Sequence, residues 1–173
     1  ISLSPNTQWD DVLRVIKILA RFLLPRTTRP EYGRGKSRGC QIQLEQEFKD
    51  YIPAKYAFSF NSGRLALYTI LKALNIQAGD EILLQAFTCS AVPNPVLWAG
   101  GTPVYVDIDN SLNLDPSDLV KKITPKSRAL IIQNTFGIPA QIDKILEIAN
   151  RNNLVVIEDC AHALGAEYHG RKL

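Results

Sequence analysis

Apolar and polar positions change their pattern about 40 residues into the chain, and from there strands and helices are expected in regular alternation. Helical periodicity predicts helices over residues 41–52, 63–76, 94–99, 116–123 and 140–152. Short apolar runs bounded by turn residues predict strands over residues 55–60, 81–86, 102–108, 127–134 and 154–159, and residues 165–170 are expected to begin a hairpin. This order predicts a three-layer α/β fold in which helices cover both faces of a mainly parallel sheet.

The first 40 residues follow a different pattern, so residues 1–40 are treated as a basic helix and arm that precede a domain over residues 41–173. Within residues 9–24 the polar side chains share one helical stripe, which favours packing against the protein body or a partner subunit. Contact with a membrane surface is the alternative, but Asp10 and Asp11 would be repelled by anionic lipid. Residues 25–39 are rich in Pro, Gly and cations and predict a loop or arm. No nucleic-acid motif accompanies them, and no nucleic-acid partner is expected.

Composition narrows the class of protein. Of the 173 residues 46% are hydrophobic and 21% charged, as expected for a soluble globular protein. The net charge of +3 is local, because residues 1–40 hold eight Lys and Arg against three Asp and Glu. Cys40, Cys89 and Cys160 lie far apart and are odd in number, which predicts a reducing cytoplasm and neither disulfides nor a metal site. The chain begins at Ile1 and contains no Met, so we expect it to be part of a longer protein.

Several polar residues stand where predicted strands end. They are Ser62 and Gly63, the segment 87–90, Asn134, and Glu158 with Asp159. Ligands of parallel sheets bind beyond the carboxyl ends of the strands, so these groups are expected to face one rim. Two interpretations of the junction "FNSGRLA" remain open: Ser62 is a simple N-cap, or the free N–H groups at the start of the helix form an anion site.

Asp159, which closes the apolar strand "LVVIE", also has two interpretations. It is a solvated strand end or N-cap, or it is a carboxylate that keeps the ring nitrogen of a bound heterocycle protonated.

Four segments in this order resemble the DegT/StrS-type sugar aminotransferases, which are PLP-dependent enzymes of fold type I. The segments are "NSGRLAL", "AGDEILLQAFTCSAVPNPVLWAGGTPVYVDID", "ITPKSRALIIQNTFGIPAQID" and "VVIEDCAHALGAEYHGRK". The resemblance runs from about Gln41 to Leu173 and implies an incomplete large domain of such an enzyme, whereas residues 1–40 do not match the family.

The resemblance implies pyridoxal 5'-phosphate (PLP) as cofactor and gives several residues a role. Ser62, Gly63 and Arg64 match the turn that binds the cofactor phosphate. Arg64 stands where the family has a hydroxyl, so its guanidinium either pairs with the phosphate or points away. Asp159 matches the aspartate that pairs with the pyridine nitrogen, and a protonated ring accepts the electrons of the substrate carbanion.

Other positions depart from the family pattern. Cys89 stands where an aromatic side chain usually stacks on the cofactor ring, and a smaller contact implies weaker cofactor binding. His162 replaces a glutamine near the ring oxygen, with a purely structural role as the alternative. No lysine of this chain matches the Schiff-base lysine, so no catalytic residue is expected here. That lysine is expected downstream of Leu173.

The function implied by the resemblance is transfer of an amino group from glutamate or a similar amino acid to a keto group of a nucleotide-linked sugar, by a cytoplasmic homodimer. Two alternatives remain open. One is the family's dehydratase branch, in which histidine replaces the lysine, and the other is a non-catalytic binding or scaffold domain. A Rossmann domain is disfavoured because no G-x-G-x-x-G motif follows the first predicted strand.

Overall fold

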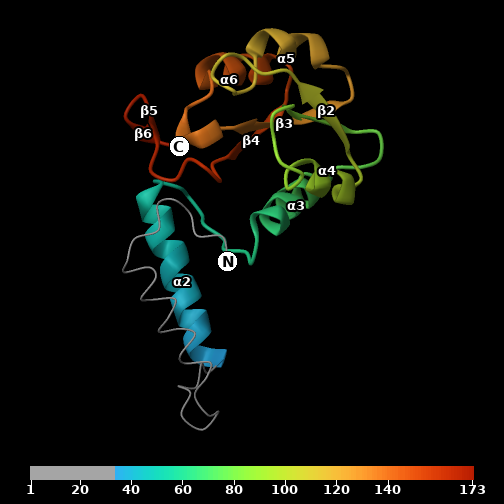
Figure 1. Ribbon diagram of the computed structural model, residues 1–173. Helices are drawn as coiled ribbons and strands as arrows, with labels where there is room; N and C mark the ends of the chain where they lie inside the picture. The colour runs from blue at the N-terminus through green and yellow to red at the C-terminus, as the bar shows by residue number, and fades with distance from the viewer. Residues whose placement is uncertain (1–33) are drawn as a thin grey trace. The chain divides into compact units, whose positions relative to one another are not determined.

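A four-stranded parallel sheet forms the centre of the fold (Figure 1). The structure, a computed structural model, describes the backbone of residues 34–173 and the side chains of residues 39–173. It divides into two units, Ile1–Leu44 and Glu45–Leu173, and each is described by itself. The predicted domain boundary between residues 40 and 41 stays a prediction.

The elements follow the predicted alternation. The helices are α2 (Arg34–Tyr51), α3 (Gly63–Ala73), α4 (Pro93–Ala99), α5 (Pro116–Lys122) and α6 (Ile142–Arg151), with a short 3₁₀ turn η2 (Thr135–Gly137). The strands are β1 (Glu81–Gln85), β2 (Thr102–Val106), β3 (Ser127–Gln133), β4 (Val155–Asp159), β5 (Glu167–Tyr168) and β6 (Arg171–Lys172). The predicted hairpin is confirmed, since β5 and β6 pair antiparallel.

The sheet has the order β2-β1-β3-β4, and every neighbouring pair is parallel. Figure 1 shows α3 and α4 on one side of it and α5 and α6 on the other. The predicted three-layer α/β architecture is therefore confirmed.

Two apolar cores lie on the two faces of the sheet. β1 supplies both, because Ile82 and Leu84 belong to the core under α3 and α4, while Leu83 belongs to the core under α5 and α6. All three side chains are buried. Burying one such side chain stabilises the fold by about 1.5–3 kcal/mol. Burial of both faces explains why the strands read as apolar runs in the sequence.

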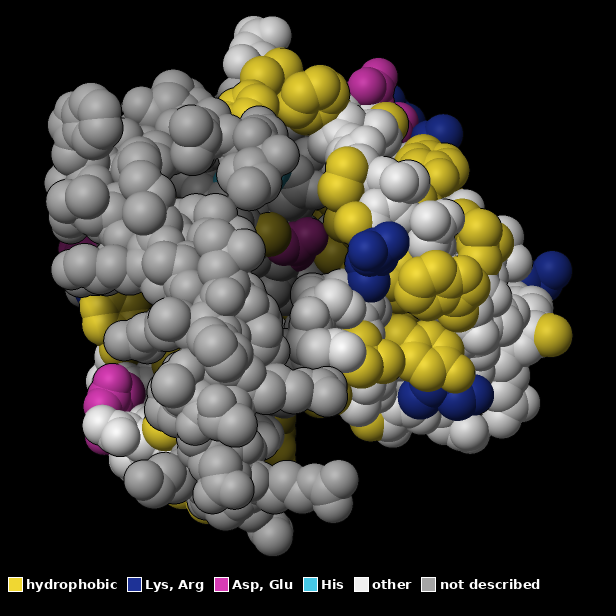
Figure 2. Space-filling view, turned by 60° about the horizontal axis from the view of Figure 1, so that its bottom comes forward, with side chains coloured by type: hydrophobic (Ala, Val, Ile, Leu, Met, Phe, Trp, Pro, Cys, Tyr) yellow, Lys and Arg dark blue, Asp and Glu magenta, His cyan; other side chains and the backbone are white. Residues whose placement is uncertain are grey.

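The outer surface of α3 and α4 is also apolar in part. Leu65 of α3 and Leu97 and Trp98 of α4 are all exposed. Figure 2 shows hydrophobic side chains gathered on this face, with Lys and Arg side chains among them. An exposed group of this kind is typical of a surface that contacts another protein.

The strand predicted over residues 55–60 is wrong. This segment belongs to no strand, and its aromatic side chains Tyr56, Phe58 and Phe60 are exposed. The backbone N–H of Ser59 donates to the Glu45 carboxylate, at 2.8 Å, in place of a neighbouring strand. The alternating pattern is real, but within residues 34–173 no strand pairs with it.

The loop or arm predicted over residues 25–39 is wrong for residues 34–39, because α2 begins at Arg34. The helix predicted over residues 9–24 and the rest of the arm lie outside the described residues. Of the helices between residues 34 and 173, none is long and apolar enough to cross a membrane.

Gly101, between α4 and β2, leaves the least room for a side chain among the glycines of the described residues. A Cβ at this position would lie 2.9 Å from Cγ2 of Ile76, and 3.3 Å from Cγ1 of Val96. Both neighbours are buried, branched side chains that have little room to move.

We therefore expect Gly101→Ala to lower the free energy of unfolding by about 1–3 kcal/mol, because it overpacks the core. The matched control is Gly39→Ala. Gly39 is an exposed helical residue at which a Cβ would meet no atom within 4 Å, so this change should be neutral or slightly stabilising. Thermal or urea unfolding of the full-length protein measures both. Equal stability of the two variants would contradict the close approach at Gly101.

Candidate functional site

The junction before α3 contains both a cap and free donors. Ser62 is the N-cap, and its hydroxyl accepts from the N–H of Leu65 at 3.2 Å. The capping interpretation is thus confirmed. The N–H groups of Gly63 and Arg64 belong to the first turn, where the helix itself offers no partner, and no described residue bonds them. A Cβ at Gly63 would meet no atom within 4 Å, so the space beside these donors is open.

A cavity of about 440 Å³ lies at this junction and reaches the ends of β1 and β4. Its polar and charged lining consists of Ser62, Arg64, Glu158 and Asp159, with Gly63 and the thiols of Cys89 and Cys160. Ala66, Leu67, Ile70, Ala91, Val92, Ile157 and Ala161 complete the lining. The structure therefore brings together five of the six predicted site residues: Ser62, Gly63, Arg64, Cys89 and Asp159.

Asp159 is half-buried at the end of β4. Its Oδ1 accepts from the N–H of Ala161 at 3.0 Å, which fixes the direction of the carboxylate. This bond resembles a turn rather than a helix cap, because no helix follows.

Asn134, directly after β3, ties this strand end to its neighbours. The side chain is fully buried; its amide donates to Oε1 of Glu158 at 2.7 Å and its oxygen accepts from the N–H of Ala140 at 3.0 Å. The backbone N–H of Asn134 also donates to the carbonyl of Asp159, at 3.3 Å. Asn134 thus holds the segment that carries the two acidic residues.

The thiol of Cys160 has low reactivity. Burial raises the pKa of its thiol to about 11, and the negative charge of Glu158 adds to this rise. The thiolate, which is the reactive form, is therefore scarce at neutral pH. In the cavity Cys160 acts as a small apolar side chain.

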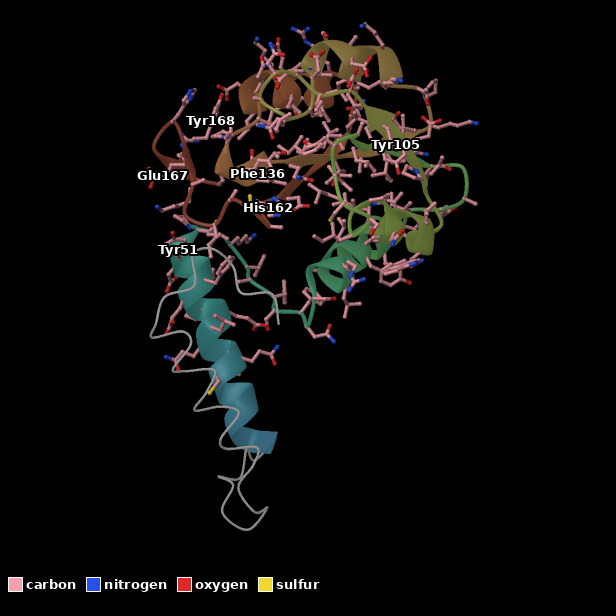
Figure 3. The ribbon with its side chains drawn as sticks, in the orientation of Figure 1. Tyr51, Tyr105, Phe136, His162, Glu167 and Tyr168 are labelled. Carbon is pink, nitrogen blue, oxygen red and sulfur yellow. The ribbon has the colours of Figure 1, made fainter. Side chains whose placement is uncertain are left out.

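His162 does not line this cavity. It lines a neighbouring cavity of about 260 Å³, together with Phe87, Thr88, Cys89, Gln133, Thr135 and Phe136. Cys89 lines both cavities, so the two are adjacent. The ring of His162 stacks on that of Phe136, with centroids 5.8 Å apart (Figure 3).

Sequence reasoning missed Phe136. Ligands of parallel sheets bind beyond the carboxyl ends of the strands, and Phe136 follows the end of β3 by only three residues, so its position in the sequence was a signal for the site. The left-handed backbone that directs this ring, with a φ of 55°, has no signature in a phenylalanine.

The arrangement of charges defines what the first cavity can bind. Free N–H groups and the Arg64 guanidinium favour an anionic group, while the Asp159 carboxylate favours a protonated nitrogen. The apolar lining between them suits a ring. Among the described residues no cluster of His, Cys, Asp or Glu could hold a metal ion.

Comparison with known proteins agrees with this geometry. The model of the DegT/DnrJ/EryC1/StrS aminotransferase family matches residues 35–173. The chain belongs to this family. The predicted resemblance is therefore confirmed, but its start is wrong, since the match begins at residue 35 and not at about Gln41.

Individual relatives support the assignment. GDP-perosamine synthase of Caulobacter vibrioides is 42% identical over 132 residues, which is 76% of this chain and 36% of that protein. The aminotransferase from Psychrobacter cryohalolentis matches 99% of this chain and 42% of its own, with a TM-score of 0.78 and 33% identity. A GDP-4-keto-6-deoxymannose-3-dehydratase, crystallised with a trapped PLP-glutamate geminal diamine, matches 99% of this chain and 44% of its own, with a TM-score of 0.76 and 26% identity. The chain thus spans little more than a third of the first relative's length.

The role of Asn134 can be tested through stability. Asn134→Ala should lower the free energy of unfolding by about 1–3 kcal/mol, since it leaves the N–H of Ala140 without its acceptor. Asn134→Asp keeps that acceptor but places a second carboxylate against Glu158. Like charges raise the pKa of a carboxyl in the folded state, so the stability of this variant should be lost as the pH rises.

Melting temperatures of the full-length protein at about pH 5 and about pH 8 measure this effect, because an ordinary carboxyl is already mostly ionised at about pH 5, whereas a carboxyl whose pKa is raised by a second carboxylate still loses its proton above that pH. The unsubstituted protein and Asn134→Ala are the controls. A loss in Asn134→Asp that is the same at both pH values would rule out the contact with Glu158.

Proposed function

We propose that this chain is the first part of the large domain of a PLP-dependent aminotransferase, which moves an amino group from an amino acid such as glutamate to a keto group of a nucleotide-linked sugar. One observation carries the proposal: the phosphate-turn residues Ser62, Gly63 and Arg64 and the ring partner Asp159 line one cavity. The names of the relatives support the reaction class. The glutamate donor is supported by the glutamate trapped in the dehydratase relative.

The residues present fit PLP. An anionic group finds the free N–H groups at the start of α3 and a cation beside them, and a protonated ring nitrogen finds a half-buried carboxylate. When bound, PLP supplies an electrophilic carbon and a ring that accepts electrons from the substrate.

Two side chains carry most of the charge in this scheme. Arg64 lines the cavity, which favours pairing of its guanidinium with the phosphate over a direction away from it. Asp159 keeps the ring nitrogen protonated, and its bond from Ala161 holds the carboxylate in place for that purpose.

Cys89 and His162 have lesser roles in the proposal. Cys89 lies in both cavities and offers the ring a small contact where relatives offer an aromatic one, so cofactor affinity is expected to be lower. His162 reaches the edge of the site from the second cavity and donates a hydrogen bond to the ring oxygen of the cofactor.

The catalytic amine is not expected within these residues. No lysine of the described part lines either cavity. We propose that sequence beyond Leu173 supplies this lysine, because the relatives are longer than this chain.

We also propose that the full-length protein is a homodimer in the cytoplasm. The exposed apolar side chains of α3 and α4 support a subunit contact, and the three unpaired cysteines support a reducing compartment.

The test of the function is Asp159→Asn in the full-length protein. The amide no longer keeps the ring nitrogen protonated, so turnover of glutamate with a keto-sugar nucleotide should fall by on the order of 10²-fold or more, at about 1.4 kcal/mol per tenfold. PLP binding should fall less. The control is Glu147→Gln, which removes an exposed carboxylate of α6 that lines neither cavity. Near-normal turnover of Asp159→Asn would show that this residue is only a solvated strand end.

The alternatives are separated by borohydride reduction of the full-length protein with PLP, followed by peptide mass mapping. The proposal expects one stoichiometric adduct on a lysine beyond Leu173. A histidine at the matching position and loss of water from the sugar would move the protein to the dehydratase branch. Failure to bind PLP at all would favour a scaffold domain, and an adduct on a lysine within residues 1–173 would overturn the proposed position of the nucleophile.

A further inference from the structure

Phe136 has a backbone conformation that its side chain does not favour. Its φ of 55° and ψ of 24° lie in the left-handed region, where a bulky residue is a rare outlier that costs stability. Burial does not offset this cost, since 64% of the residue is exposed. Such local strain is typical of positions where function requires one side-chain direction.

Hydrogen bonds on both sides hold Phe136 in this conformation. The N–H of Thr135 donates to the buried Asn113 side chain at 2.8 Å, and the Thr135 hydroxyl accepts from the Gln85 amide at 3.0 Å. On the other side, the N–H of Gly137 donates to the carbonyl of Asn134 at 3.2 Å. The loop therefore imposes the direction of the ring.

The ring contacts two others at the rim. It lies nearly parallel to the His162 imidazole, at an interplanar angle of 6°, and edge-on to Phe87, with centroids 6.4 Å apart. Figure 3 shows Phe136 and His162 close together, coming from the segments that follow β3 and β4. Within the described part of the chain, the imidazole makes no hydrogen bond or ion pair, so the stack is what sets its plane.

We propose that Phe136 is a positioning residue for His162, and that it fixes the imidazole plane at the edge of the candidate cofactor cavity. This inference rests on the proposed function for its consequence, since His162 is the proposed donor to the cofactor's ring oxygen. It also explains why an exposed aromatic side chain keeps a strained conformation here. Phe136 lines the second cavity, which adjoins the candidate cofactor cavity at Cys89.

The first measurement concerns the stack alone. Phe136→Asn tolerates the left-handed backbone but removes the ring, whereas Phe136→Tyr keeps the ring. In NMR spectra of the full-length protein without cofactor, the carbon-bound ring protons of His162, assigned with His162→Gln, should lose their ring-current shift in Phe136→Asn and keep it in Phe136→Tyr. Phe87→Leu, which leaves the parallel stack intact, is the matched control. Unchanged His162 signals in Phe136→Asn would overturn the proposal.

The second measurement is a double-mutant cycle on the dissociation constant of PLP, with Phe136→Asn, His162→Gln and the pair. Positioning predicts that the two changes are coupled, so that Phe136→Asn weakens PLP binding by about 2- to 12-fold when His162 is present and much less when it is absent. Phe136→Tyr should restore the affinity. Independent effects of the two changes would overturn the positioning role. If the unsubstituted protein bound no PLP, the proposed function would fail, and the NMR comparison would still decide whether Phe136 orients His162.

Discussion

Burial of both faces of the parallel sheet fixes the register between its strands, and that register decides which residues reach the rim. Gln133 at the end of β3 is paired with Asp159 at the end of β4. Most of β3 is buried on both faces, while β4 contributes Ile157 to one core and packs Val156 against the other. A slip of one residue would exchange the side chains of the two faces, so that side chains shaped for one core would have to pack in the other. The two cores therefore hold the polar and charged groups of the candidate site in place, although none of those groups belongs to a core.

The site depends on a second constraint, which is that a buried polar side chain such as Asn134 needs hydrogen-bond partners. Asn134 meets this requirement through two other segments, the end of β4 with Glu158 and the backbone of Asp159, and the loop that carries Ala140. A buried amide that lost one of these contacts would leave a donor or acceptor unsatisfied. Rigid placement of the acidic strand end thus follows from hydrogen bonding, while its position along the sheet follows from hydrophobic burial.

Most of the fold could be predicted from the sequence, because helices that bury one stripe repeat their apolar residues with a clear period, and strands buried on two faces form short apolar runs between turn residues. The rim residues followed from the same prediction, since parallel strands end on one side. The strand prediction over residues 55–60 failed because alternation of apolar and polar residues indicates an extended segment but not that another strand lies beside it. Phe136 was missed because Asn113 and Gln85, far away in the sequence, impose its backbone conformation.

The two thiols of the candidate site differ in a way that bears on oxidative damage. Cys160 stays protonated because burial and the Glu158 carboxylate oppose its ionisation, and a protonated thiol is slow to react with peroxide. Cys89 is exposed and lines both cavities. Of these two thiols it is therefore the one that oxidants in solution reach more readily, directly beside the place proposed for the cofactor.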